Sequence, residues 1–167
     1  MAPDPTFPSL RISGRPVAIA DLREVPDLAG VVAERVWRAW WQPHGVPLAA
    51  LRDRLEESFG AAAIPSTWVA HRGGSFLGTV ALIAGDVEQR PAFTPWAAAL
   101  WVEPAARGAG LGTALAAHAA ARAFAAGHDR VYLAATPENA PFYLRRGWSR
   151  VESGVDGLDI LVRRHED

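Results

Sequence analysis

One stretch of the chain decides its fold, and it reads Leu100-Trp101-Val102-Glu103-Pro104-Ala105-Ala106-Arg107-Gly108-Ala109-Gly110-Leu111-Gly112-Thr113. An apolar run ends here, an arginine and alternating glycines follow, and an alanine-rich segment then continues to Ala125. This order predicts a strand, a tight turn and a long helix over residues 109–125. Glycines let the backbone approach an anion closely, and the amides at a helix N-terminus carry partial positive charge. The stretch therefore predicts an anion-binding turn, with Arg107 adding a full charge at its rim.

Dinucleotide-binding folds also use such glycines, but their pattern differs from this one. They need Gly-x-Gly-x-x-Gly in an early β-α-β unit, with an acidic residue at the end of the next strand. Here the glycines stand at 108, 110 and 112, far into the chain, and the next predicted strand, Val131–Ala135, is followed by Thr136-Pro137. The spacing therefore argues against a nicotinamide dinucleotide site.

Outward from this turn, hydrophobic spacing predicts alternating strands and helices. The expected strands are 17–19, 67–71, 76–83, 96–102, 131–135, 148–152 and 158–163, and the expected helices are 27–41, 47–59, 109–125 and 138–146. Gly73-Gly74 between two strand-like runs predicts a hairpin. The order predicts an α/β fold (an α+β arrangement) with a mixed central sheet of about six to seven strands and about four helices. We expect one domain over residues 15–167 and a flexible, proline-rich lead-in over residues 1–14.

Composition excludes several kinds of chemistry. The chain has 167 residues, of which 50% are hydrophobic and 21% are charged, as in one globular domain. All 17 basic residues are arginine, and the chain contains neither lysine nor cysteine. A disulfide scaffold, a Cys₄ zinc site, a thiol nucleophile, a Schiff-base lysine and a Walker loop are thereby excluded. The five histidines show no metal-ligand spacing, so no metal site is expected.

Charge and targeting signals give a consistent expectation of location and partners. The formal net charge of −1 provides no overall attraction to nucleic acid or to a membrane. The N-terminal residues show no signal-peptide pattern, and no apolar run reaches the roughly 18 residues of a membrane span. We therefore expect a cytoplasmic protein, either monomeric or homodimeric, that binds neither nucleic acid nor membrane.

Two blocks of the sequence together resemble a known family. Arg107-x-x-Gly110-x-Gly112, after a strand and before a long helix, resembles the acetyl-CoA signature of the GCN5-related N-acetyltransferases (GNAT). The second block, Asn139-Ala140-Pro141-Phe142-Tyr143-Leu144-Arg145-Arg146-Gly147-Trp148, is similar to that family's Asn…Phe-Tyr-x-x-x-Gly-aromatic block. One helix and one strand separate the blocks, as in the family. The resemblance covers roughly residues 17–163 and implies a GNAT-like domain that transfers an acetyl group from acetyl-CoA directly to a primary amine.

The resemblance also implies roles for residues of this chain. A main-chain N–H in the segment that pairs with the pantetheine arm polarises the thioester, and Tyr143 protonates the departing CoA thiolate. Asn139 contacts the cofactor or orders its loop, although its spacing to Tyr143 is shorter than in many members. The implied cofactor-binding residues are Leu100, Trp101, Val102, Arg107, Gly108, Ala109, Gly110, Leu111, Gly112, Thr113 and Asn139. Arg145 and Arg146 are further candidates for phosphate contacts.

The acceptor side is less defined. Glu103 and Asp86 are candidates for the general base, as is Glu88, but each can equally be a solvated loop charge. The acceptor is expected to be an amine on a small molecule or a peptide. Three tryptophans of the first helix form either a wall of the acceptor pocket or ordinary packing: Trp37, Trp40 and Trp41. Trp68 and Trp101 lie within predicted strands and are expected in the core.

Because no residue is assigned as the general base, a non-catalytic function is an alternative to the transferase. A non-catalytic module that binds or senses acyl-CoA on the same fold would show the same two blocks. Sustained turnover with any amine distinguishes an enzyme from such a sensor.

Overall fold

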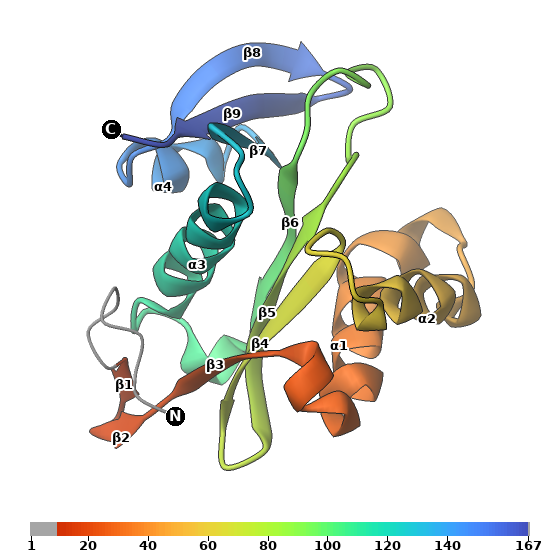
Figure 1. Ribbon diagram of the computed structural model, residues 1–167, viewed down its shortest axis with the longest axis vertical. Helices are drawn as coiled ribbons and strands as arrows, with labels where there is room; N and C mark the ends of the chain where they lie inside the picture. The colour runs from red at the N-terminus through yellow and green to blue at the C-terminus, as the bar shows by residue number, and fades with distance from the viewer. Residues whose placement is uncertain (1–9, 167) are drawn as a thin grey trace.

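Within residues 10–166, which the computed structural model describes, seven strands form one mixed sheet in the order β3-β4-β5-β6-β7-β9-β8 (Figure 1). The strands are β3 (Ala18–Asp21), β4 (Ser66–Arg72), β5 (Ser75–Ile83), β6 (Trp96–Val102), β7 (Arg130–Ala135), β8 (Ser149–Val155) and β9 (Leu158–Arg164). Neighbouring strands are antiparallel except β6 and β7, which are parallel. The predicted mixed α/β fold is confirmed.

Helices cover both faces of the sheet. In Figure 1, α1 (Ala29–Val36) and α2 (Leu48–Glu56) lie on one side, and α3 (Leu111–Ala125) and α4 (Ala140–Leu144) on the other. Side chains along β4 alternate accordingly, because successive residues of a strand point to opposite faces. Trp68 and Ala70 belong to the core under α3, whereas Val69 between them packs with α1 and α2.

Small residues allow α3 to approach the sheet closely. The buried side chains of this helix are mostly alanines, with Leu111 and Leu115. On β5, a Cβ atom added to Gly78 would lie 2.8 Å from the Trp101 carbonyl oxygen and 3.1 Å from Cδ1 of Leu115. Gly78 is therefore required where α3 crosses the β5–β6 pair, and this packing fixes the start of α3 relative to the end of β6.

The segment after α1 departs from the predicted continuous helix over 27–41. The α-helix ends at Val36, and residues Trp37–Trp41 form a π-helical turn. Indole Nε1 of Trp37 donates to the Val46 carbonyl oxygen at 2.6 Å, which ties this wide turn to the chain that follows it. The changed helical spacing leaves Trp40 43% exposed.

Other boundaries shift modestly. The predicted helix over 138–146 is limited to α4, and β8 extends to Val155 because Asp156 and Gly157, both with positive φ, make the turn to β9. Within the predicted lead-in over 1–14, residues 1–9 lie outside the described residues, and β1 (Arg11–Ile12) pairs with β2 (Arg15–Pro16). Among residues 10–166, no helix has the length and apolar character needed to cross a membrane.

Candidate active site

Strands β6 and β7 pair only at one register position and then separate. This pair is Trp96 with Tyr132, where the Tyr132 N–H donates to the Pro95 carbonyl oxygen at 2.9 Å. No later register pair joins the two strands within the described range 10–166. The backbone edge of β6 beyond this pair thus has donors and acceptors available to an extended ligand.

A β-bulge lies in β6 beside this separation. Thr79 pairs with Trp101 and Ala81 pairs with Ala98, so one residue of β5 faces two of β6. Within the bulge Ala99 has a φ of 53°, a conformation that residues other than glycine seldom adopt. Bulges bend a strand and redirect its groups, so the backbone here turns away from regular pairing with β5.

The turn that follows β6 leaves the first amides of α3 without a capping side chain. Gly108 and Gly110 have φ values of 82° and 87°, which favour glycine. Gly110 is the N-cap residue and no side chain caps the helix, nor does its first turn contain an acidic residue. The amides of residues 111–113 have no carbonyl partner within the helix. Unpaired amides at the start of a helix are suited to binding an anion.

The second sequence block lies against the first. Arg146 Nε donates to Thr113 Oγ1 at 2.8 Å, and its Nη1 donates to the Phe142 carbonyl oxygen at 2.7 Å. The guanidinium carbon of Arg146 lies 3.8 Å from the centre of the Phe142 ring. A Cβ atom on Gly112 would lie 3.7 Å from Cζ of Phe142 and 3.8 Å from Cγ2 of Val102. The structure therefore brings the end of β6, the start of α3 and α4 into one site.

Arg107 lies at the rim of this site. Its Nε donates to the Val102 carbonyl oxygen at 2.9 Å, and its guanidinium carbon lies 4.8 Å from the centre of the Trp101 ring. The side chain remains exposed. A guanidinium held in this way leaves its outer N–H groups for a phosphate.

Tyr143 lies within α4, and Asn139 lies at its N-cap. The partly buried Tyr143 ring contacts Phe142 and Trp148 edge-on, with centroid distances of 5.1 and 6.2 Å. Burial raises the pKa of the Tyr143 hydroxyl to about 12, so the group keeps its proton at neutral pH. Asn139 is exposed at the N-cap of α4 and makes no side-chain capping hydrogen bond.

The candidate bases lie at different places. Glu103 Oε1 accepts from Arg35 Nε at 2.6 Å and from Trp101 Nε1 at 3.3 Å. Asp86 lies on the loop between β5 and β6, and Glu88 is exposed on the same loop. Asp86 reaches solvent, yet the protein around its carboxyl desolvates the group and raises its pKa.

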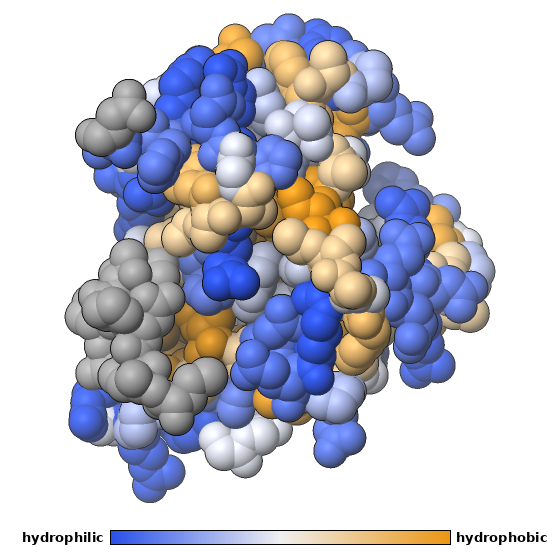
Figure 2. Space-filling view, viewed as in Figure 1, coloured by the Kyte–Doolittle hydropathy of each residue, from blue (hydrophilic) through white to orange (hydrophobic). Residues whose placement is uncertain are grey.

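Aromatic side chains lie beside the end of β6. Trp68 is buried as predicted, but the prediction that Trp101 belongs to the core is wrong, because this side chain is only partly buried. Its ring lies edge-on to Trp40 at 6.4 Å. Figure 2 shows apolar side chains at the surface in the middle of the face where β5 and β6 lie in Figure 1, with mostly polar side chains around them.

Sequence reasoning missed Arg35, the partner of Glu103. The two residues are 68 positions apart in the sequence. An ion pair between segments this far apart has no local sequence signal, so only the fold could identify this pair.

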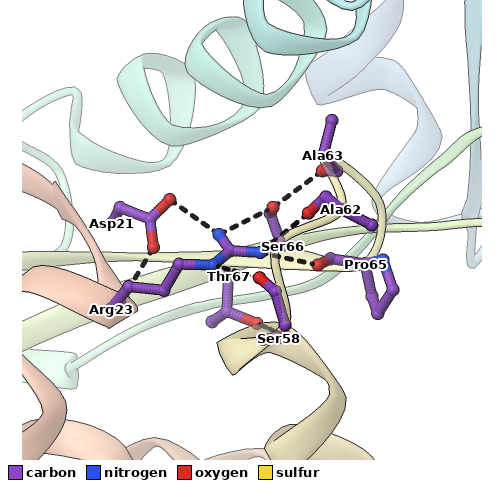
Figure 3. Close-up of polar contacts among 9 residues, drawn as sticks. Asp21, Arg23, Ser58, Ala62, Ala63, Pro65, Ser66 and Thr67 are labelled. Atoms are coloured by element: carbon purple, nitrogen blue, oxygen red, sulfur yellow. Dashed lines mark hydrogen bonds and ion pairs between the residues drawn. The ribbon is translucent and has the colours of Figure 1, made fainter.

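A cavity of about 580 Å³ lies elsewhere, between β4 and the C-terminal end of α3. Arg23 lines it and makes hydrogen bonds to the carbonyl oxygens of Gly60, Ala62 and Pro65, to Ser66 Oγ and to Asp21 (Figure 3). The 15 residues of α3 place this cavity about 20 Å from the anion-binding turn. Because its central guanidinium is already satisfied, the geometry favours the turn, and not this cavity, as the functional site.

The sequence over residues 33–148 matches the family model described as "Acetyltransferase (GNAT) family". The chain belongs to this family. GNAT members are acetyltransferases, so the chain is an enzyme of the acyltransferase class, and the family predicted from the two sequence blocks is confirmed. No curated protein matches the chain in sequence.

Solved structures share this GNAT fold. An aminoglycoside 6'-N-acetyltransferase complexed with coenzyme A superimposes with a TM-score of 0.70 at 14% identity, over 90% of this chain and 99% of that one. A GCN5-related N-acetyltransferase from Ralstonia eutropha gives 0.61 at 25% identity, over 83% and 95%. A GNAT acetyltransferase from Staphylococcus aureus gives 0.65 at 13% identity, over 89% and 98%. Among residues 10–166, no cluster of three or more His, Asp or Glu side chains could hold a metal ion.

Proposed function

We propose that this GNAT enzyme transfers the acetyl group of acetyl-CoA directly to a primary amine on a small molecule or a peptide. The observation that carries the proposal is the uncapped N-terminus of α3, which follows the strand whose edge separates from β7. A phosphate-bearing ligand with an extended arm fits these two features in that order.

The residues present suit acetyl-CoA. The amides of Gly108–Thr113 and the guanidinium of Arg107 would bind the pyrophosphate, and the edge of β6 over Leu100–Val102 would pair with the pantetheine arm. A main-chain N–H of that segment would polarise the thioester carbonyl. Asn139, exposed beside this path, would contact the cofactor.

Direct transfer requires no nucleophile from the protein. The amine nitrogen forms a bond to the thioester carbon, the carbon–sulfur bond breaks, and the sulfur leaves as a thiolate. Tyr143, which holds its proton at neutral pH because burial raises its pKa, would protonate this thiolate. The absence of cysteine and lysine is consistent with such a route.

The amine must also lose a proton, and Asp86 is a better acceptor for it than Glu103. Glu103 shares one carboxylate oxygen between Arg35 and Trp101, whereas the described residues give Asp86 no ion pair. Asp86 follows Ile83, which pairs with Trp96 at the start of β6. From Trp96 to the bulge at Ala99, strand β6 advances about 10 Å. Asp86 would therefore be too far from an amine at the bulge to take its proton directly, so we expect water to relay the proton from the amine to Asp86.

The test is cofactor binding followed by turnover. We expect acetyl-CoA and CoA at millimolar concentration to raise the melting temperature of the chain by several degrees. Thiol release measured over a panel of amines should then continue for many turnovers with at least one amine, above the rate without amine. Absence of thermal stabilisation by either compound would refute the cofactor assignment. Stabilisation without turnover on any amine would instead favour a sensor.

A further inference from the structure

We propose that Trp101 and Glu103 are positioning residues that hold the guanidinium of Arg107 at the anion-binding turn. The inference rests on the proposed function, since it takes the phosphates of acetyl-CoA as the ligand of Arg107. It assigns Glu103 to the orientation of the cofactor site and not to proton transfer.

The indole of Trp101 is held on three sides. Its Nε1 donates to Glu103 Oε1 at 3.3 Å, and its ring meets Trp40 edge-on at 6.4 Å. The guanidinium carbon of Arg107 lies 4.8 Å from the centre of the same ring. An aromatic ring restrained at its N–H and by a second ring provides a fixed surface for a cation. This explains why Trp101 lies at the surface end of β6 and not in the core.

Glu103 is itself fixed from both backbone and side chain. Its main-chain N–H donates to the Leu77 carbonyl oxygen at 2.9 Å, and its carboxylate accepts from Arg35 Nε at 2.6 Å. Arg35 also contacts Glu34, which pairs with Arg38 at 2.7 Å. The side chains of Arg35 and Glu103 are 28% and 24% exposed, so solvent screens this pair only in part. The carboxylate therefore stays in place to orient the indole.

Arg107 is oriented but not neutralised. Its Nε is used by the Val102 carbonyl oxygen at 2.9 Å, and among the described residues 10–166 no carboxylate pairs with it. Five N–H donors are available on a guanidinium, so the outer four remain for phosphate oxygens. A side chain held in its binding conformation loses less conformational freedom when the ligand arrives. The ring under Arg107 should therefore strengthen CoA binding without touching CoA.

A double-mutant cycle on CoA affinity tests this role. We expect Arg107→Ala to weaken CoA binding about tenfold and Trp101→Leu to weaken it about three- to fivefold. The double variant should bind CoA no more weakly than Arg107→Ala alone, because Trp101 acts through Arg107. Trp101→Phe keeps the ring face but loses the hydrogen bond to Glu103, so it should weaken CoA binding by about twofold, less than Trp101→Leu does. Isothermal titration calorimetry with CoA measures each affinity, and melting temperatures without ligand report folding.

The chain offers a matched control in Trp41, whose ring lies under the guanidinium of Arg54 at 5.8 Å and packs in the cluster formed by α1 and α2. Trp41→Leu removes a similar stacked pair and should leave CoA affinity unchanged. If Trp101→Leu does not fold, Glu103→Ala replaces it in the cycle with Arg107→Ala. Losses that add in the double variant would overturn the positioning role while leaving CoA binding intact. Failure of the wild type to bind CoA would overturn the proposed function and this inference together.

Discussion

The two ends of α3 both carry a glycine with positive φ, but they differ in what happens to the backbone around it. At the C-terminal end, Gly127 has a φ of 96° and donates its N–H to the Phe124 carbonyl oxygen at 3.0 Å. His128 N–H also donates to the Ala123 carbonyl oxygen, at 3.1 Å. At the N-terminal end, Gly110 has a φ of 87°, and no side chain caps the helix. The C-terminal end, called the closed end below, is capped by its own backbone hydrogen bonds. The N-terminal end, called the open end, has backbone N–H groups without such partners among residues 10–166.

The cavity and the candidate active site lie at opposite ends of α3. A hollow of about 580 Å³ lies at the closed end, where Arg23 is fully engaged by surrounding oxygens. The N-terminal end of α3, the open end, has uncapped amides and the outer N–H groups of Arg107, which no residue in the described range 10–166 accepts. A ligand gains little binding free energy from a group whose hydrogen bonds are already made, whereas a hydrogen bond to an unsatisfied donor contributes much more. The site is therefore identified by available donors and not by empty volume.

The largest expected effect comes from exchanging each of these glycines for glutamate. Gly110→Glu should weaken CoA binding at least about 100-fold, because it places a carboxylate where we propose that the phosphate binds and strains the turn. Gly127→Glu introduces the same charge and a similar backbone strain at the closed end, and neither glycine has an atom within 4 Å of an added Cβ. Calorimetry with CoA compares the two variants. Equal loss of affinity in both would show that the ends of α3 do not differ in function.

The next effect concerns catalysis at the open end alone. Tyr143→Phe should lower kcat about 100-fold and leave the KM for acetyl-CoA nearly unchanged, since it removes a proton donor and retains the ring. Tyr132→Phe removes the only other tyrosine hydroxyl of the chain and should change kcat less than about threefold. Steady-state thiol release with an amine that supports turnover measures both. Wild-type kcat in Tyr143→Phe would remove the hydroxyl from the mechanism.

The open end was largely predictable from sequence, because its signals are local. Gly108, Gly110 and Arg107 lie within four positions, and the strand before them and the helix after them have clear periodicity. The Gly73-Gly74 hairpin was predicted for the same reason and is confirmed by the pairing of Arg72 with Ser75. Glycines at positions that require a positive φ are therefore local signals from which the fold and the family can be predicted.

Other features depend on contacts between distant segments, and the sequence could not provide them. The ion pair between Arg35 and Glu103 spans 68 positions, and the partial exposure of Trp101 follows from its place at the end of β6 beside α1. Its position within a predicted strand suggested that this tryptophan was buried. The π-helical turn at Trp37–Trp41 likewise replaces a regular helix that the spacing favoured. Tertiary packing overrides local preference at each of these points.

A smaller effect tests the closed end as a purely structural region. Arg23→Ala should lower the free energy of unfolding by about 2–3 kcal/mol, because several carbonyl oxygens lose a charged donor. Arg122→Ala, an exposed residue lining the same cavity, should change it by less than about 0.5 kcal/mol. Both variants should bind CoA like the wild type. Urea unfolding and calorimetry measure these values, and weaker CoA binding in Arg23→Ala would make the cavity part of the functional site.

The smallest effect is a pH dependence of stability that belongs to the open end. Burial raises the pKa of Tyr143 to about 12, above the ordinary value of about 10 for tyrosine in an unfolded chain. The unfolded chain therefore ionises this group first as pH rises, so the stability that the neutral hydroxyl contributes is present below pH 10 and is lost towards pH 12. Tyr143→Phe lacks this titration, so its free energy of unfolding should decline less than that of the wild type between pH 9 and about pH 11.5. Parallel decline of the two proteins in urea unfolding would mean that the Tyr143 hydroxyl is solvated, and that the open end lacks a buried proton donor.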